Sequence, residues 1–244
     1  MDKRLQKEIE AFKDVESYAE LMARPYTRAL KEETHRRMTE FTFDRMRILE
    51  VGAGITEFED LYKNSALICL SDINFKLLSE NRDKAGVRIV CDGQNLPFKD
   101  ETFDYVIFIG VLHHFPDQEK GLAEASRIMK VGGRSFMVEP HRLSINYFYY
   151  LGRRLFLFLF GEKFVKKLIG CFTPDEVQLD VRAVKRIFRP TSEIKINTML
   201  SFRLPPFRLF KKATLDVRLS QFFDRVFPFN KIGTTIFVNV IKKQ

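Results

Sequence analysis

The sequence predicts an α/β protein built on a doubly wound, mostly parallel sheet of seven strands, with N-terminal helices and helical additions in its C-terminal part. From Arg47 onward, short apolar runs alternate with helical patterns, which is typical of a parallel sheet covered by helices on both faces. The first apolar run, residues 48–51, is followed at once by Gly52 and Gly54. This pattern predicts a buried strand that ends in a tight turn, where a ligand can approach the backbone.

The first 44 residues are expected to form a helical lid segment. They are rich in charge and carry apolar side chains at helical spacing, for example Leu5, Ile9 and Phe12. Pro25 should break this region into two helices.

Residues 45–141 are expected to form the ligand-binding core. The predicted strands are residues 48–51, 66–70, 87–90, 105–109 and 134–138, and the predicted helices lie at about 56–63, 74–82 and 118–129. In such a sheet, ligands bind beyond the carboxyl ends of the strands.

Residues 142–244 should complete the sheet. A helix is predicted from a start signal at residues 173–176 to about Phe188, and strands at 193–199 and 233–241. The remaining stretches, 142–172 and 203–230, read as basic, Phe-rich cap additions.

The glycine turn favours a cationic ligand without phosphates. A dinucleotide fingerprint would need a third glycine where Glu57 stands. Glu50, two residues before Gly52, can accept hydrogen bonds from an ammonium group or from the N–H groups of the turn itself.

Asp72 follows the second strand, some 20 residues after the turn, where an acid can bind the two ribose hydroxyls of a nucleoside. The alternative role for Asp72 is to cap the following helix.

Four motifs in order resemble those of class I S-adenosylmethionine-dependent methyltransferases, with a core like that of quinone methyltransferases. The segment Glu50-Val51-Gly52-Ala53-Gly54 resembles the first motif, with Thr56 at the position of the usual third glycine. The other three similar segments are residues 91–104, 109–117 and 127–134. The resemblance covers residues 47–140 and implies a Rossmann-like methyltransferase fold with S-adenosylmethionine as cofactor.

The resemblance also implies roles for individual residues. Asp92 would accept from the adenine amino group, the backbone of Gly93 or Gln94 would meet the ring, and Gly110 would pass close to the methionine part. Tyr18 or Tyr26 would be lid residues, unless they pack against the core. The full set of expected cofactor-binding residues is Glu50, Gly52, Ala53, Gly54, Asp72, Ile73, Asp92, Gly93, Gln94 and Gly110.

Histidine is the side chain best suited to act as a base at neutral pH. Three of the four histidines follow the fourth and fifth strands. His141 and His114 are the candidate bases, with His113 ranked behind them. A base is optional for this chemistry, because the sulfonium is already an excellent leaving group and positioning supplies much of the rate.

Charge is unevenly distributed. Residues 141–244 hold 20 Lys/Arg, 7 Asp/Glu and 15 of the 25 Phe. This composition favours an anionic or amphiphilic partner, such as a lipid-linked acceptor or an anionic membrane surface, although the aromatic residues could also be buried in a cap or a homodimer contact.

Three functions therefore stay open. The first is methyl transfer to a small or lipid-linked acceptor, at oxygen. The second is methylation of RNA, for which no recognisable RNA-binding module is found. The third is a non-catalytic, cofactor-binding scaffold. The N-terminus lacks the apolar segment of a signal peptide, and no run reaches about 18 apolar residues, which predicts a cytoplasmic protein, peripheral at a membrane if attached to one. Three widely spaced cysteines predict no metal site.

Overall fold

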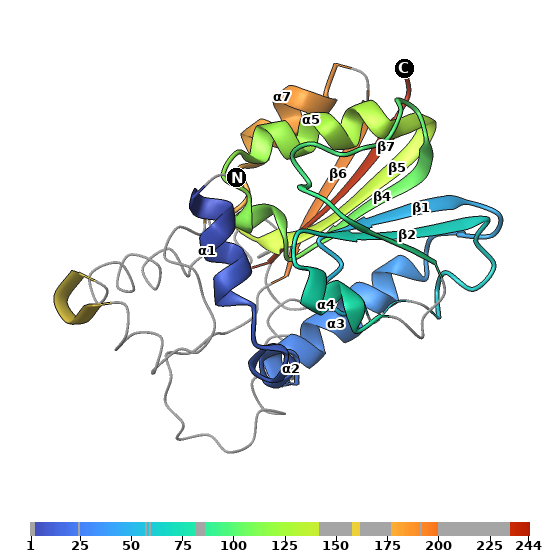
Figure 1. Cartoon of the computed structure of the whole chain (residues 1–244). Coiled ribbons are helices and arrows are strands. Elements are labelled where there is room, and N and C mark those ends of the chain that lie inside the picture. Colours follow the sequence, from blue (N-terminus) through green and yellow to red (C-terminus); the bar gives the residue numbers. More distant parts are fainter. Residues whose placement is uncertain are drawn as a thin grey trace.

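The computed structural model describes the core and the final strands of the sheet (Figure 1). The described residues are 3–23, 25–56, 58, 60–81, 86–141, 158–161, 177–190, 192–199 and 235–244. The predicted additions at 142–172 and 203–230 lie outside these residues, except for 158–161, which are helical. Within the described residues, no helix has the length and apolar character needed to cross a bilayer.

The sheet has seven strands in the order β3-β2-β1-β4-β5-β7-β6. Strand β7 pairs antiparallel with both β5 and β6, and the other pairs are parallel, so the predicted doubly wound, mostly parallel sheet is confirmed. The strands are β1 (Arg47–Val51), β2 (Leu67–Asp72), β3 (Val87–Val90), β4 (Phe103–Ile109), β5 (Met129–Pro140), β6 (Ser192–Met199) and β7 (Thr235–Lys242).

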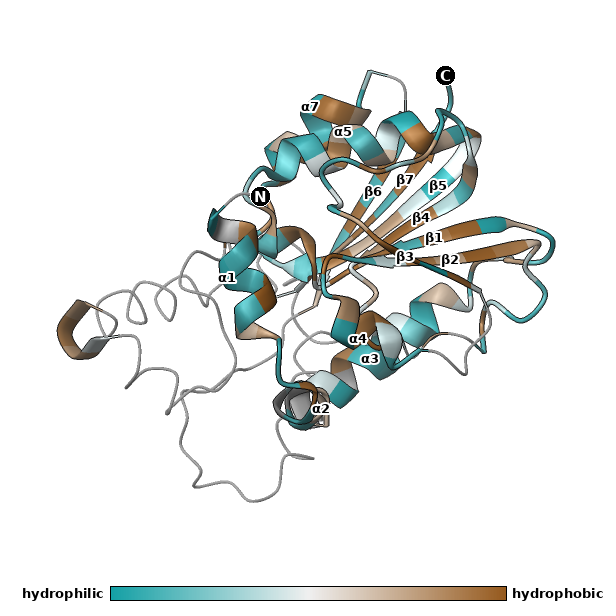
Figure 2. Ribbon diagram, in the orientation of Figure 1, coloured by the Kyte–Doolittle hydropathy of each residue, from teal (hydrophilic) through white to brown (hydrophobic). Residues whose placement is uncertain are grey.

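Helices cover both faces of the sheet. Figure 1 shows α5 (Gln118–Ile128) and α7 (Val181–Phe188) on one face, and α3 (Pro25–Met38) and α4 (Phe75–Ser79) on the other. Alternate residues of a strand point to opposite faces, so each strand contributes side chains to two hydrophobic cores. In β1, Leu49 packs in the core with α5 and α7, whereas Ile48 packs in the core with α3 and α4. The apolar strands lie between helices of mixed hydropathy (Figure 2).

The N-terminal segment forms three helices rather than two. Helix α1 (Lys3–Ala11) and helix α2 (Val15–Met22) precede α3, which begins at Pro25. Proline suits the first turn of a helix, because the N–H that it lacks would have no partner there. The first break falls at residues 12–14, where Asp14 accepts a hydrogen bond from the Glu16 N–H.

Three predicted helices differ from the structure, and one of them, α4, ends at Ser79 instead of about residue 82. The described residues of 56–63 form turns instead of a helix. Here the Thr56 hydroxyl is bound to Glu50 and the Thr56 N–H to Asn81, and these buried bonds hold the first residue of the segment in a non-helical position. Helix α7 ends at Phe188 as predicted, but it begins at Val181, because Asp180 caps it by accepting from the Arg182 N–H.

Candidate active site

The glycine turn after β1 is enclosed by two other parts of the chain. Gly52 and Gly54 have φ angles of 66° and 49°, which favour glycine. A Cβ on Gly52 would lie 2.1 Å from a methyl carbon of Val111, in the turn after β4. A Cβ on Gly54 would lie 2.7 Å from the hydroxyl of Tyr18 in α2. The turn therefore meets the end of β4 on one side and an N-terminal helix on the other.

Glu50 lies beneath this turn and is 3% exposed. Its Oε2 accepts from the Thr56 hydroxyl at 2.7 Å and lies 3.4 Å from the Tyr62 hydroxyl. Thr56, which replaces the usual third glycine, is itself buried and turned toward this carboxylate. The departure from the motif thus adds a hydroxyl donor that stabilises a buried charge.

Asn81 was not identified from the sequence, yet it binds both sides of the turn. Its side-chain amide donates to the Gly54 carbonyl at 2.6 Å and accepts from the Thr56 N–H at 3.1 Å. Asn81 is fully buried. Since it lies 27 residues from Gly54, no local pattern could have identified this contact.

Asp72 ends β2 at the same edge of the sheet. Its two carboxylate oxygens accept from the backbone N–H groups of Gly54 and Asn74, at 2.8 and 2.7 Å. The alternative role as helix cap is wrong, because Asn74 caps α4. Burial raises the pKa of Asp72, against the effect of these N–H bonds. A carboxylate has about four acceptor positions, so capacity remains for ribose hydroxyls. Ile73 follows and is partly exposed.

The loop after β3 is braced by its own side chains. Asp92 Oδ1 accepts from the backbone N–H and the side-chain amide of Gln94, at 2.9 and 3.0 Å. Gln94 in turn accepts from the Asp117 N–H at the start of α5. A Cβ on Gly93 would lie 2.4 Å from the Phe115 ring, so packing against that ring is what requires glycine here.

Gly110 borders open space. It has a φ of 66°, and no atom of the described residues lies within 4 Å of a Cβ built on it. Ala53, whose N–H donates to the Ser71 carbonyl, completes the edge between β1 and β2. The set of expected cofactor residues thus follows the carboxyl ends of β1, β2, β3 and β4.

Helices α1 and α2 and the residues between them pack against this edge. The Phe12 carbonyl accepts from the Asn74 side chain at 2.9 Å, and the Phe12 ring meets the His114 ring edge to face. Glu8 in α1 lies 3.0 Å from Nδ1 of His114. Tyr18 contacts the glycine turn, as described above, whereas the side chain of Tyr26 lies outside the described part.

The three histidines at this edge have different surroundings. His113 and His114 belong to the short 3₁₀ turn η1 (Leu112–His114), and their ring centroids lie 3.9 Å apart with the planes tilted by 41°. His141 is 4% exposed and forms a β-bridge with Leu179. The structure therefore places His114 against the lid and His141 in the interior.

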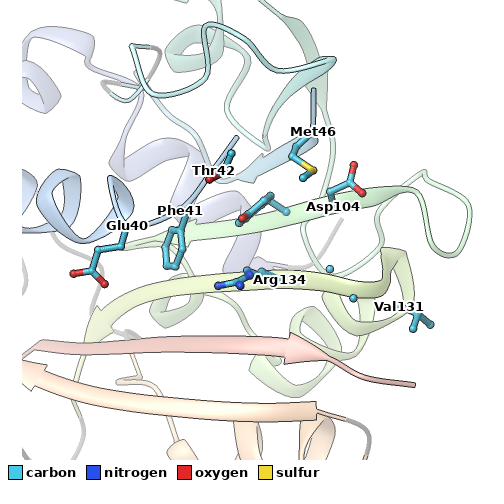
Figure 3. Close-up of a pocket in the computed structure, with 10 residues that line it drawn as sticks. Glu40, Phe41, Thr42, Met46, Asp104, Val131 and Arg134 are labelled. Carbon is cyan, nitrogen blue, oxygen red and sulfur yellow. The ribbon is translucent and has the colours of Figure 1, made fainter. Parts of the chain in front are cut away.

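A separate pocket of about 450 Å³ lies at the opposite edge of the sheet (Figure 3). Asp104 and Tyr105 line it at the amino end of β4, together with Arg134 and Phe41. It is remote from the glycine turn, which is at the carboxyl ends of the strands.

A glycine turn, the acid Asp72 and an open glycine position lie along one edge of a Rossmann-like sheet, an arrangement similar to that of class I S-adenosylmethionine-dependent methyltransferases. Residues 49–137 match the family model described as a methyltransferase domain. This part of the chain is therefore a methyltransferase domain, and S-adenosylmethionine is its cofactor.

Curated relatives match over the same region. The ubiquinone/menaquinone biosynthesis C-methyltransferase UbiE of Xanthomonas campestris is 30% identical over 114 residues, covering 42% of this chain and 45% of the relative. The demethylmenaquinone methyltransferase of Corynebacterium kroppenstedtii is 32% identical over 109 residues, which cover 45% of this chain and 47% of the relative. The matches thus span less than half the length of these relatives.

Solved structures share the fold over more of the chain. The N-methyltransferase NodS from Bradyrhizobium japonicum, in complex with S-adenosylhomocysteine, has a TM-score of 0.59 at 11% identity and covers 100% of both chains. A possible histamine N-methyltransferase from Thermotoga maritima has a TM-score of 0.58 at 18% identity, covering 86% of this chain and 88% of the other. At these identities the likeness shows the fold alone.

Proposed function

We propose that the protein transfers the methyl group of S-adenosylmethionine to an oxygen of a small or lipid-linked, amphiphilic acceptor at or near a membrane surface. The observation that carries methyl transfer is the meeting of the Gly52–Gly54 turn, Asp72 and Gly110 at one edge of the methyltransferase domain. When bound, the cofactor supplies an electrophilic methyl group on a good leaving group, so the protein has mainly to position the acceptor and exclude water.

The chain's own residues have defined tasks in this proposal. The turn and Asp72 would hold the nucleoside and methionine parts, with the open side of Gly110 turned toward the reactive centre. The lid residues Phe12 and Tyr18 would cover the site and exclude water.

Two observations support an amphiphilic acceptor. One relative named above is a ubiquinone/menaquinone biosynthesis C-methyltransferase, and the other is a demethylmenaquinone methyltransferase. Phe158, Leu159 and Phe160 have exposed fractions of 86%, 58% and 52%, and this helical segment is drawn as hydrophobic in Figure 2. Apolar side chains flanked by basic residues are typical of attachment to anionic lipid surfaces.

The test is a transfer assay with methyl-labelled S-adenosylmethionine and two acceptor preparations. One is a demethylated quinol in vesicles containing phosphatidylglycerol, and the other is total bacterial RNA. We expect label in the lipid extract, lost in Asp72→Ala, with the methyl group on oxygen by mass spectrometry. Label on a ring carbon would replace the oxygen assignment, label in RNA would replace the acceptor class, and no transfer to any acceptor would contradict the proposal.

Membrane attachment is tested by flotation of the protein with the same vesicles. We expect flotation that requires anionic lipid and weakens with salt, because exposed charges are screened. Equal flotation with neutral vesicles would contradict the electrostatic part of the proposal.

A further inference from the structure

Glu139, at the end of β5, organises the turn that follows β4. Its side chain is fully buried. Oε1 accepts from the N–H groups of Val111 and Leu112, at 2.9 and 2.7 Å. Oε2 lies 2.7 Å from Nδ1 of His113 and 3.4 Å from the His113 N–H.

These contacts determine which nitrogen of His113 carries its proton. A carboxylate only accepts hydrogen bonds, so Nδ1 of His113 must be the donor in the 2.7 Å contact. In the neutral ring, the lone pair then lies on Nε2, for which no hydrogen-bond partner is recorded among the described residues. The backbone of His113 is held as well, because its carbonyl accepts from the Val177 N–H.

His113 also belongs to the turn that follows the open position at Gly110. It lies three residues after Gly110, beyond the carboxyl end of β4, and its side chain keeps an exposed fraction of 14%. A base must lie within hydrogen-bond reach of the proton that it removes, and it is often oriented by a third group. The hydrogen bond from Nδ1 to Glu139 would orient the His113 ring in this way.

We propose that His113 is the general base of the methyl transfer and that Glu139 is its positioning residue, an inference that rests on the function proposed above. In this step the methyl carbon leaves the sulfonium sulfur, which keeps the bonding electron pair, and forms a bond to the acceptor oxygen. The hydroxyl proton of the acceptor passes to Nε2 of His113 and later to solvent.

The two other histidines are less suited to this role. Nδ1 of His114 faces Glu8 of the lid, and His141 is buried. Among the described residues, Glu139 from β5 and His114 from the same turn contact His113, and Glu8 from α1 contacts His114.

The first test measures the tautomer of His113 by ¹⁵N NMR of histidine-labelled protein, without any ligand. We expect Nδ1–H in the wild type. In Glu139→Gln the side-chain oxygen can still accept from the Val111 and Leu112 N–H groups, whereas its NH₂ would face Nδ1, so we expect Nε2–H to become the main form. A wild-type ring protonated on Nε2 would overturn the inference.

The second test measures kcat with the demethylated quinol, with S-adenosylhomocysteine affinity by calorimetry as the control for folding. We expect His113→Asn to lower kcat by about 100-fold or more while the affinity stays within about twofold. The pH profile of kcat should show an acid limb in the wild type, because a protonated base cannot accept the proton, and the residual rate of His113→Asn should lack that limb.

His35→Gln is the matched control, because it removes another imidazole that is paired with a carboxylate, at the exposed contact with Asp60. It should change neither kcat nor the pH profile. If the wild type transfers methyl groups and His113→Asn does so equally fast, the role of His113 as base is overturned and the proposed function is not. A wild type that transfers methyl to no acceptor would overturn the proposed function, whatever the tautomer.

Discussion

Asn81 shows how a single buried amide can shape the cofactor turn. It donates to the Gly54 carbonyl and accepts from the Thr56 N–H, so it fixes two backbone groups on either side of one residue. Both groups are far from bulk water, and a buried backbone group without a partner is costly. We therefore regard Asn81 as part of the cofactor site although it need not touch the cofactor.

Asn81→Ala should both destabilise the protein and weaken cofactor binding. Leaving two buried backbone groups without partners should lower the free energy of unfolding by about 2 kcal/mol. The loosened turn should lower S-adenosylhomocysteine affinity about tenfold. Denaturant unfolding and calorimetry measure these effects, with Ser79→Ala, an exposed hydroxyl on α4, as control. Unchanged affinity in Asn81→Ala would contradict this role.

Gly110→Ala tests whether the open space at Gly110 receives the ligand. The positive φ should cost about 1 kcal/mol of stability in this variant, and the new methyl group would enter the open space. We expect S-adenosylhomocysteine affinity to fall at least tenfold.

Gly132→Ala is the matched control for Gly110→Ala. Gly132 has a φ of 80° and equally open surroundings among the described residues, but it lines the pocket at the opposite edge. Gly132→Ala should lose about as much stability as Gly110→Ala, but its affinity for S-adenosylhomocysteine should not change. Equal affinities in the two variants would show that Gly110 does not border the cofactor.

Residues identified from the sequence are those whose role follows from local chemistry. Gly52, Gly54 and Asp72 stand at the ends of strands, where glycine and an acid have a recognisable meaning. Asn81 and Glu139 each bind a residue 27 positions away in the sequence, Gly54 and Leu112 respectively, and only the folded chain creates these contacts. Thr56 looked like a departure from a motif, and its bond to Glu50 could not be inferred without the structure.

At the scale of elements, Arg127 joins helix α5 to the loop after β3, which we expect to meet the adenine. Its guanidinium donates to the carbonyls of Leu96 and Phe98 and to the carboxylates of Glu124 and Asp100. Glu124 also accepts from the Leu96 N–H. The Arg127–Glu124 pair therefore binds both N–H and carbonyl groups of this loop.

This pair should make stability depend on pH. The hydrogen bond from Arg127 is the main reason that the pKa of Glu124 is lowered. A lowered pKa stabilises the fold above the pKa of the unfolded state, about 4.3, and this contribution is lost as pH falls through the folded pKa. Denaturant unfolding at pH 7 should show Glu124→Gln as less stable than the wild type, by about 1 kcal/mol. The difference should shrink at pH 4 and below, and a constant difference would contradict the assignment.

Elements with a clear period were predicted well, and elements governed by distant contacts were not. Strand β3 has the predicted bounds, and α5 differs by one residue at its end, because apolar periodicity and a capping aspartate mark them locally. Strand β5 begins at Met129 instead of 134, because its first residues pair with Phe103 before an irregularity in the register. The helix predicted at 56–63 failed because buried hydrogen bonds to Glu50 and Asn81 hold its first residue.

At the scale of the whole molecule, the two ends of the sheet have different properties. The carboxyl edge carries the glycine turn, Asp72 and the histidines under the lid, while the amino edge carries an open pocket. The order of the strands was within reach of sequence reasoning, because parallel α/β sheets follow few topologies. The particular contacts that place α1 against this edge were not, since they join residues far apart in the sequence, such as Glu8 and His114.

The most direct test of the central claim is calorimetric titration of the whole protein with S-adenosylmethionine and S-adenosylhomocysteine. We expect binding on the order of micromolar, about −8 kcal/mol, weakened at least tenfold by Asp72→Ala, which removes the expected acceptor for the ribose hydroxyls. Asp100→Ala, an exposed carboxylate paired with Arg127, should bind as the wild type does. A wild type that binds neither compound, or an Asp72→Ala variant with undiminished affinity, would contradict the account.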